Sequence, residues 1–192
     1  MIAIIKYNGG NTRSVQNALT RIKADSIVTD DPELIAKASK VILPGVGQAN
    51  TAMHYLRDNK LDTCIRSLTQ PFLGICLGMQ LMCAYSEEGN TPCLEIFDAA
   101  VKRFPPLEKV PHIGWNNFST LQGDLFKKIE INADLYYVHS YYAELSKYTI
   151  ASCDYILPFS AAMQKNNFYG TQFHPEKSAD VGTQIIKNFL HL

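Results

Sequence analysis

Short runs of consecutive apolar residues alternate with amphipathic segments along the first half of the chain. The apolar runs have the length of buried strands, and they lie at residues 2–7, 26–29, 40–44 and 71–75. The segments between them carry apolar residues at helical spacing, and they predict helices over residues 12–22, from Asp31, over 49–69 and from Cys76. Strands that alternate with helices favour a parallel sheet covered on both faces.

The helix expected after residue 30 has a clear start signal. Asp31 is a favourable N-cap residue, Pro32 follows at the first helical position, and Glu33 lies in the first turn. An N-cap carboxylate accepts hydrogen bonds from unpaired backbone amides, and proline has no amide to leave unpaired there. We therefore predict that this helix begins at Pro32.

After residue 95 the pattern changes to strand-like runs with little helix between them. Such runs occupy residues 135–145, 148–156, 159–164 and 168–173, and residues 181–192 predict a closing helix. Strand-like runs joined by short turns indicate an antiparallel extension of the same sheet. The expected fold class is α/β, with an open, mostly parallel sheet flanked by helices and an antiparallel extension in the C-terminal half. We expect one domain over residues 1–192.

The composition is that of a globular protein without a strong charge imbalance. The 192 residues are 46% hydrophobic and 19% charged, and 18 basic residues balance 18 acidic ones. This balance gives no indication of binding to nucleic acid or to an anionic membrane. The apolar runs are much shorter than the roughly 20 residues of a membrane span. We therefore expect a cytoplasmic protein whose partners are small molecules or another protein.

The cysteines are odd in number and carry no metal or disulfide spacing. The chain has five of them and no C-x-x-C pair. Free thiols are therefore expected, with neither a disulfide framework nor a zinc site. We predict no metal and no cofactor.

Cys76 lies between two glycines where an apolar strand is expected to give way to a helix. The sequence "GICLG" at residues 74–78 is the cysteine counterpart of the G-x-S-x-G nucleophile elbow. A tight turn of this kind exposes a nucleophile, and a helix start favours the reactive thiolate. The alternative is a glycine-rich packing turn with a buried, inert thiol, because free cysteine often behaves as a small hydrophobe.

The segment "QFHPEKS" at residues 172–178 offers a general base and a group to orient it. His174 follows a predicted strand, and Glu176 lies two residues further, with Pro175 between them. A carboxylate held against one imidazole nitrogen sets the tautomer and stabilises the imidazolium. The alternative is an exposed histidine in a turn beside a solvated glutamate. The elbow cysteine favours the catalytic interpretation, because a cysteine nucleophile needs such a base.

An acyl-transfer site also needs donors for the developing oxyanion. The backbone amide of Leu77, directly after the nucleophile, is one expected donor. The turn "PGVG" at residues 44–47 ends a predicted strand and offers the amides of Val46 and Gly47. An amide that reorients there would switch the site on; the alternative is a simple tight connection.

Three other histidines and one cysteine are assigned structural roles. His54, His112 and His191 have no cysteine or carboxylate neighbour that suggests a metal site. Cys83 is expected on the helix opened by Cys76, as a core residue.

Together these motifs resemble the class I (triad) glutamine amidotransferases. The elbow cysteine and the late His-Pro-Glu are matched by Cys76, His174 and Glu176. Further blocks resemble the glutaminase subunits of imidazole glycerol phosphate synthase, in the same order along the chain. These blocks are "PGVG" (44–47), "GICLGMQLM" (74–82), "SEEG" (86–89), "PHIGWN" (111–116), "YVHSY" (137–141) and "QFHPEKS" (172–178).

The chain departs from that family pattern in two places outside the triad. Lys6 and Asn8 stand where the family motif "DYGxGN" has an acidic residue and glycine. Cys93 and Glu95 stand where the family has glycines after "SEEG". These differences concern the partner contact or the loop shape and leave the triad intact.

The resemblance implies a flavodoxin-like amidotransferase fold, glutamine as substrate, and a (β/α)8 barrel cyclase subunit as the partner in a heterodimer. It implies a set of substrate-binding residues, assisted by the Gly47 backbone: Gly45, Gln80, Glu88, Ser140 and Tyr141. It also implies a set of residues that face the partner: Asn11, Trp115, Tyr136 and Lys177. Ammonia would pass to the cyclase, which makes imidazole glycerol phosphate and an aminoimidazole carboxamide ribotide.

Two other functions fit the same motifs. The chain could be a class I glutaminase subunit of another pathway, because the elbow and "HPE" motifs are common to many amidotransferases. It could also be a non-catalytic homologue that only docks on a barrel partner. Labelling of Cys76 by an electrophilic glutamine analogue would exclude the second of these.

Overall fold

A mixed eight-stranded sheet forms the centre of the molecule in the computed structural model, which describes residues 1–9 and 11–192. Five neighbouring strands are parallel: β2 (Ser26–Thr29), β1 (Ile2–Ile5), β3 (Lys40–Gly45), β4 (Phe72–Cys76) and β14 (Phe168–Thr171). The sheet continues with three antiparallel strands: β13 (Leu157–Lys165), β12 (Thr149–Tyr155) and β9 (Thr120–Leu121). The predicted fold class, a parallel sheet with an antiparallel extension, is confirmed.

Helices cover both faces of this sheet because alternate residues of each parallel strand are apolar on both sides. In β1, Ala3 and Ile5 pack into one core and Ile4 packs into the other. The first core is closed by α2 (Pro32–Lys37), α3 (Ala49–Asp58) and α4 (Leu61–Ser67), and the second by α1 (Thr12–Arg21) and α6 (Ala179–Leu190). None of the described helices has the length and hydrophobicity of a membrane span.

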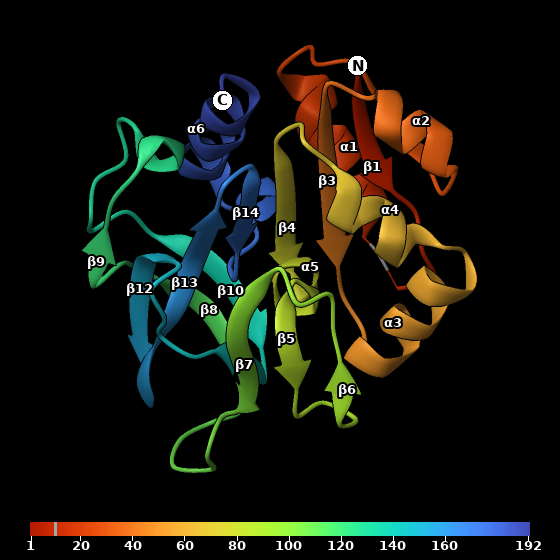
Figure 1. Ribbon diagram of the computed structural model, residues 1–192. Helices are drawn as coiled ribbons and strands as arrows, with labels where there is room; N and C mark the ends of the chain where they lie inside the picture. The colour runs from red at the N-terminus through yellow and green to blue at the C-terminus, as the bar shows by residue number, and fades with distance from the viewer. Residues whose placement is uncertain (10) are drawn as a thin grey trace.

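The carboxyl ends of β3 and β4 meet at the short helix α5 (Leu77–Leu81), toward which both strand arrows point (Figure 1). Gly45 at the end of β3 is directly opposite Cys76 at the end of β4. β14 pairs with β4 on its other side, so residues that follow β14 reach the same edge. Because sites in such sheets form at the carboxyl ends of the strands, this edge is where chemistry is expected.

The antiparallel half is only partly an extension of the main sheet. Two small separate sheets also form there. One contains β11 (Tyr141–Ala143), β7 (Phe97–Arg103), β5 (Cys83–Ser86) and β6 (Thr91–Pro92); the other pairs β10 (Leu135–His139) with β8 (His112–Asn116). The described residues also form two short 3₁₀ turns, η1 (Asp124–Phe126) and η2 (Pro175–Lys177).

The local sequence predicts the start of α2 correctly but not the division of the helical region after it. The side chain of Asp31 accepts a hydrogen bond from the Glu33 amide at 2.8 Å, and α2 begins at Pro32 as predicted. The helix expected over residues 49–69 is instead two helices, because Lys60 adopts a left-handed conformation with φ of 57° and ends the first of them.

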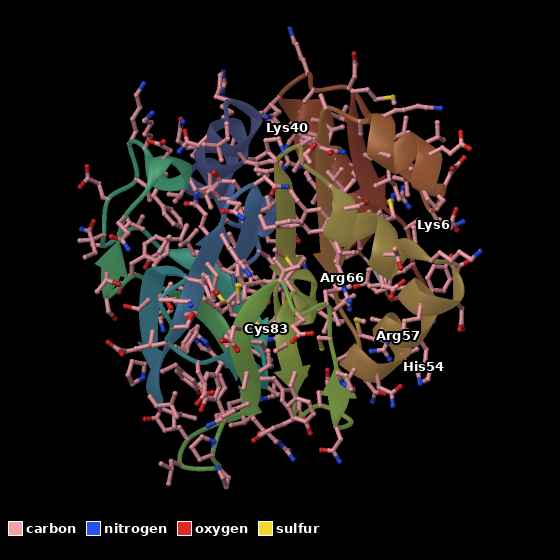
Figure 2. All side chains as sticks on the ribbon, viewed as in Figure 1. Lys6, Lys40, His54, Arg57, Arg66 and Cys83 are labelled. Carbon is pink, nitrogen blue, oxygen red and sulfur yellow. The ribbon has the colours of Figure 1, made fainter. Side chains whose placement is uncertain are left out.

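The helix after Cys76 is shorter than its periodicity indicates. It ends at Leu81, and Cys83, which we expected on this helix, begins strand β5. Parallel pairing of β5 with β7 takes over at this point, since tertiary strand pairing overrides helical propensity. Cys83 is fully buried near the middle of the molecule (Figure 2), so its expected place in the core is confirmed.

Candidate active site

Cys76 adopts an unusual backbone conformation at the junction of β4 and α5. Its φ is 53° and its ψ is −110°, a combination that costs a non-glycine residue about 1–3 kcal/mol. Such strain persists only where the surrounding structure enforces it, and it is typical of functional sites. The turn places the Cys76 sulfur at the mouth of a cavity, although the residue is only 5% exposed.

The glycines around Cys76 allow α5 to lie directly against β3. A Cβ atom on Gly78 would collide with the carbonyl of Leu43, and one on Gly45 would collide with the backbone of Leu77 and Gly78. The glycines therefore serve close approach between helix and strand, and Cys76 itself carries the positive φ. A Cβ atom on Gly74 would likewise collide with the backbone of Gly78, so close packing explains both glycines of "GICLG".

His174 and Glu176 form a buried pair beyond the end of β14. His174 Nδ1 lies 2.9 Å from Glu176 Oε1, and both side chains are only 2% exposed. Because a carboxylate only accepts, Nδ1 carries the hydrogen and Nε2 is left as the basic nitrogen. Nε2 is buried and has no hydrogen-bond partner of good geometry among the described residues.

The charge state of His174 depends on Cys76. Burial lowers the pKa of His174, but the charge and hydrogen bonding of the Cys76 thiolate outweigh burial, and Glu176 adds to them, so the pKa rises to about 10. A thiolate at Cys76 therefore favours the imidazolium form of His174. This is the protonation state that a cysteine nucleophile requires.

A cavity of about 310 Å³ opens in front of the Cys76 sulfur. This volume is within the range of small-molecule sites. Its lining residues are Val46, Gly47, Cys76, Leu77, Gln80, Glu88, Pro111, Val138, His139, Ser140 and Tyr141.

One charged side chain, Glu88, and one neutral amide side chain, Gln80, face this cavity. Glu88 is half-buried and accepts a hydrogen bond from the Ala49 amide at 2.8 Å; burial raises the pKa of this carboxyl, and the Ala49 amide opposes the rise. Gln80 is 4% exposed and donates through Nε2 to the Tyr141 carbonyl at 2.8 Å and to Gln172 Oε1 at 2.9 Å. Its Oε1 is the polar atom left for a ligand.

The amide of Val46 donates a hydrogen bond to the carbonyl of Gly9 at 3.3 Å. In this conformation the amide is engaged and is not free for an oxyanion. Leu77 is the first residue of α5, so its amide has no acceptor within the helix. Of the three predicted donors, the Val46 amide is therefore occupied by Gly9, the Leu77 amide has no acceptor within its helix, and Gly47 lines the cavity.

Two large apolar side chains are exposed on one face of β8, beside β10 and near the triad. Trp115 and Ile113 are 56% and 53% exposed. The rings of Trp115 and Tyr136 meet at 5.8 Å, Lys177 Nζ lies 5.8 Å from the Tyr136 ring, and that ring lies 6.5 Å from the His174 ring. Asn11 precedes α1 and is partly exposed.

Comparison with known proteins identifies the family. The family model for glutamine amidotransferase class-I matches residues 4–192. The chain belongs to the class-I glutamine amidotransferases. It is 57% identical to the imidazole glycerol phosphate synthase subunit HisH of Bacteroides fragilis, with 100% of this chain and 99% of the relative aligned. It is 47% identical to the subunit HisH 2 of Legionella pneumophila, with 100% and 98% aligned.

The fold of this class-I amidotransferase matches solved structures as well. A crystal structure described as a glutamine amidotransferase superposes with a TM-score of 0.74, at 15% identity, covering 100% of this chain and 98% of that one. At such low identity the likeness shows the fold alone. The family resemblance drawn from the sequence motifs is confirmed by the match at residues 4–192.

The amidotransferase fold brings most of the predicted site residues to one cavity. Gly45 does not line the cavity; it packs under α5. His174 and Glu176 do not line the cavity either.

Sequence reasoning missed three buried polar residues beside this cavity. His139 lines the cavity. His112, which we assigned a structural role without naming a partner, has its Nδ1 atom 3.1 Å from Nε2 of His139. Gln172 is fully buried, with Nε2 at 3.6 Å from Cys76 Sγ. All three lie inside the motif blocks "PHIGWN", "YVHSY" and "QFHPEKS". A polar residue inside a strand-like block of this kind needs a hydrogen-bond partner if it is buried, and this is the signal that could have identified them.

Proposed function

We propose that this chain is the glutaminase subunit of imidazole glycerol phosphate synthase in histidine biosynthesis. The observation that carries the proposal is the pairing of His174 Nδ1 with Glu176 while Nε2 stays free beside the elbow cysteine Cys76. Identity of 57% to a HisH subunit over the whole chain supports the pathway. The chain hydrolyses glutamine to glutamate and ammonia.

The reaction begins when the Cys76 thiolate attacks the side-chain carbonyl carbon of glutamine. A C–S bond forms, and the carbonyl oxygen becomes an oxyanion that the Leu77 amide stabilises. The imidazolium of His174 gives its Nε2 proton to the amide nitrogen, and the C–N bond breaks to release ammonia. A glutamyl thioester remains on the sulfur.

Hydrolysis of this thioester returns the enzyme to its starting state. Neutral His174 takes a proton from a water molecule through Nε2, the hydroxide adds to the thioester carbonyl, and the C–S bond breaks. Glu176 holds the hydrogen on Nδ1 throughout. Its buried carboxylate therefore stabilises the imidazolium each time Nε2 gains a proton.

The cavity side chains are proposed to recognise the charged α-amino-acid end of glutamine. The carboxylate of Glu88 would accept hydrogen bonds from the α-ammonium group. Gln80 Oε1 is a further acceptor for it, and the backbone of Ser140 and Tyr141 lies along the cavity wall. The substrate amide then lies toward the Cys76 sulfur.

The proposed partner is a (β/α)8 barrel cyclase that forms a heterodimer with this chain and receives the ammonia. The aromatic pair of exposed Trp115 and half-buried Tyr136, with Lys177 beside it, supports docking on this face. Asn11 is proposed to face the same partner. Exposed aromatic side chains of this kind are common interface anchors.

Docking is proposed to complete the oxyanion hole. The Val46 amide would leave the Gly9 carbonyl and turn toward Cys76, so that two donors face the oxyanion. Val46 is 38% exposed, which leaves this turn accessible. We place the reaction in the cytoplasm, where a thiol such as Cys76 stays reduced.

The test is a glutaminase assay with and without the barrel subunit and its ribonucleotide ligand. A large rise in glutamate production with both present is expected. Cys76→Ala should abolish glutamate production while synthesis from added ammonium salts continues, and Cys64→Ala, which changes a thiol on α4 away from the cavity, should retain it. Glutamate production by Cys76→Ala would contradict the proposal.

A further inference from the structure

Gln172 is a fully buried polar residue in contact with the nucleophile. It follows β14 directly, and its backbone amide donates to the Ala161 carbonyl at 2.8 Å, which fixes its position. Its side-chain Nε2 lies 3.6 Å from Cys76 Sγ, across 96 positions of the sequence. Its Oε1 accepts a hydrogen bond from Gln80.

The orientation of the Gln172 amide is set by its neighbours. The Tyr141 carbonyl only accepts, so the group of Gln80 that lies 2.8 Å from it is the NH₂ group. The second hydrogen of that NH₂ group points to Gln172 at 2.9 Å, which requires the Gln172 oxygen on that side. The Gln172 NH₂ group must therefore face Cys76.

A further series of hydrogen bonds anchors the Tyr141 carbonyl. This carbonyl also accepts from His139 Nδ1 at 2.8 Å, so Nε2 of His139 is bare and accepts from His112 Nδ1 at 3.1 Å. His112 Nε2 in turn lies 3.4 Å from the amide nitrogen of Asn116. Burial lowers the pKa of His139 to about 3 and that of His112 to about 4, so both rings stay neutral and keep these directions.

The thiol and the thiolate of Cys76 use this environment differently. A thiol donates its hydrogen toward the Val138 carbonyl, which lies 3.9 Å from the sulfur. A thiolate has no hydrogen and only accepts, and hydrogen bonds to a charged acceptor are the stronger ones. An N–H group held against the sulfur therefore stabilises the thiolate more than the thiol.

We propose that Gln172 is a further catalytic residue of the glutaminase reaction, whose side-chain amide donates a hydrogen bond to the Cys76 sulfur and stabilises the attacking thiolate. Gln80, which is anchored by the Tyr141 carbonyl, positions Gln172 by donating to its Oε1. Gln80 therefore serves the nucleophile as well as the substrate. The covalent steps of the glutaminase reaction stay as described above. The inference rests on the proposed glutaminase function, and its test includes a measurement that does not need glutamine.

The variants are Gln172→Met, which removes the donor, and Gln172→Glu, which keeps an acceptor for Gln80 but places an oxygen against the sulfur. Gln164→Met is the matched control, because Gln164 is a glutamine of the adjacent strand β13 that bonds Tyr169 and does not line the cavity. Each is assembled with the synthase partner. The rate of Cys76 alkylation by iodoacetamide is followed from pH 5 to 10, and kcat for glutamine is measured.

A hydrogen bond to a charged group predicts an effect of about 10- to 100-fold. Both Gln172 variants should lose that factor in alkylation rate at neutral pH and in kcat, and their alkylation profiles should move to higher pH. Gln164→Met should behave as wild type. If Gln172→Met does not fold, the alkylation profile and kcat of Gln172→Glu decide whether Gln172 stabilises the thiolate.

Two results would overturn the inference. One is a Gln172 variant that matches wild type in kcat and alkylation. The other is a variant that loses kcat while its alkylation profile stays in place, which would mean a packing role only. If the wild-type complex failed to hydrolyse glutamine, the proposed function would fail, yet the alkylation comparison would still decide the role of Gln172.

Discussion

Glu176 accepts a hydrogen bond from His174 Nδ1 at 2.9 Å, and the two side chains are equally buried. The second carboxylate oxygen, Oε2, has no partner among the described residues. A buried carboxylate with one unpaired oxygen is costly, so the nearby imidazolium is its main compensation. The pair is therefore coupled: Glu176 orients the ring and the charged ring stabilises Glu176.

Glu176→Gln tests this coupling with little change of shape. The amide can donate as well as accept, so it no longer enforces a hydrogen on Nδ1, and the wrong tautomer removes the base from Nε2. We expect kcat for glutamine to fall by about 10²- to 10⁴-fold, as orienting carboxylates of triads contribute on that scale. Steady-state kinetics of the assembled complex measure it. An unchanged kcat would show that Glu176 does not set the tautomer.

The raised pKa of His174 predicts a pH dependence of stability. The value is about 6.5 unfolded and about 10 folded. The stabilisation is therefore complete below pH 6.5 and is lost as pH rises toward 10. Because the Cys76 thiolate is the principal cause of the rise, Cys76→Ser should show a smaller loss. We expect Tm to fall more steeply between pH 7 and 10 in the wild type than in this variant, as measured by thermal melts at matched ionic strength. Parallel curves would contradict the coupling.

Two substitutions of the nucleophile isolate the strain in the elbow. Cys76→Gly and Cys76→Ala both remove the thiol, but only glycine adopts φ of 53° with ψ of −110° without strain. The glycine variant should be more stable than the alanine variant by about 1–3 kcal/mol in chemical denaturation. Ala36→Gly on the exposed face of α2 is the control, with an expected loss of about 1 kcal/mol. A less stable Cys76→Gly would mean that the elbow is not strained.

Local chemistry explains which parts of this molecule could be predicted from its sequence. The N-cap at Asp31 and the elbow at Cys76 depend on residues within a few positions, so their patterns were sufficient. The end of α5 at Leu81 was not predictable in this way, because it depends on pairing between β5 and β7. The same holds for the contact of Gln172 with Cys76, which spans 96 positions.

The state of the oxyanion turn illustrates the same limit. "PGVG" identified Val46 as a donor, but the bond of its amide to Gly9 joins two distant loops. Which acceptor an amide chooses depends on tertiary structure and not on the turn sequence. The family resemblance supplied the substrate and partner residues, whereas the alternation of exposed side chains on β8 adds Ile113 to that face.

Trp115→Ala tests the proposed docking face. The ring is 56% exposed and packs edge-on against Tyr136, so its removal should leave folding intact. If it anchors the barrel partner, Kd should rise by about 30-fold or more, the effect of a typical interface hot spot. Isothermal calorimetry with the barrel subunit measures this. Leu34→Ala on α2, 40% exposed and on a different part of the surface, should leave Kd unchanged; equal effects of the two would place the partner elsewhere.

Glu88 and Glu87 are adjacent carboxylates with different surroundings, which makes them a matched pair. Glu88 faces the cavity, whereas Glu87 is exposed and accepts from the Arg103 amide at 2.8 Å. Glu88→Gln keeps an acceptor for the Ala49 amide but removes the charge offered to the α-ammonium group. KM for glutamine should therefore rise by about 10- to 100-fold, since hydrogen bonds between charged groups have that strength. Because the contact is the same in ground and transition states, kcat should change little. Glu87→Gln should match wild type in both constants. If KM rose in Glu87→Gln and not in Glu88→Gln, the assignment of substrate recognition to Glu88 would be wrong.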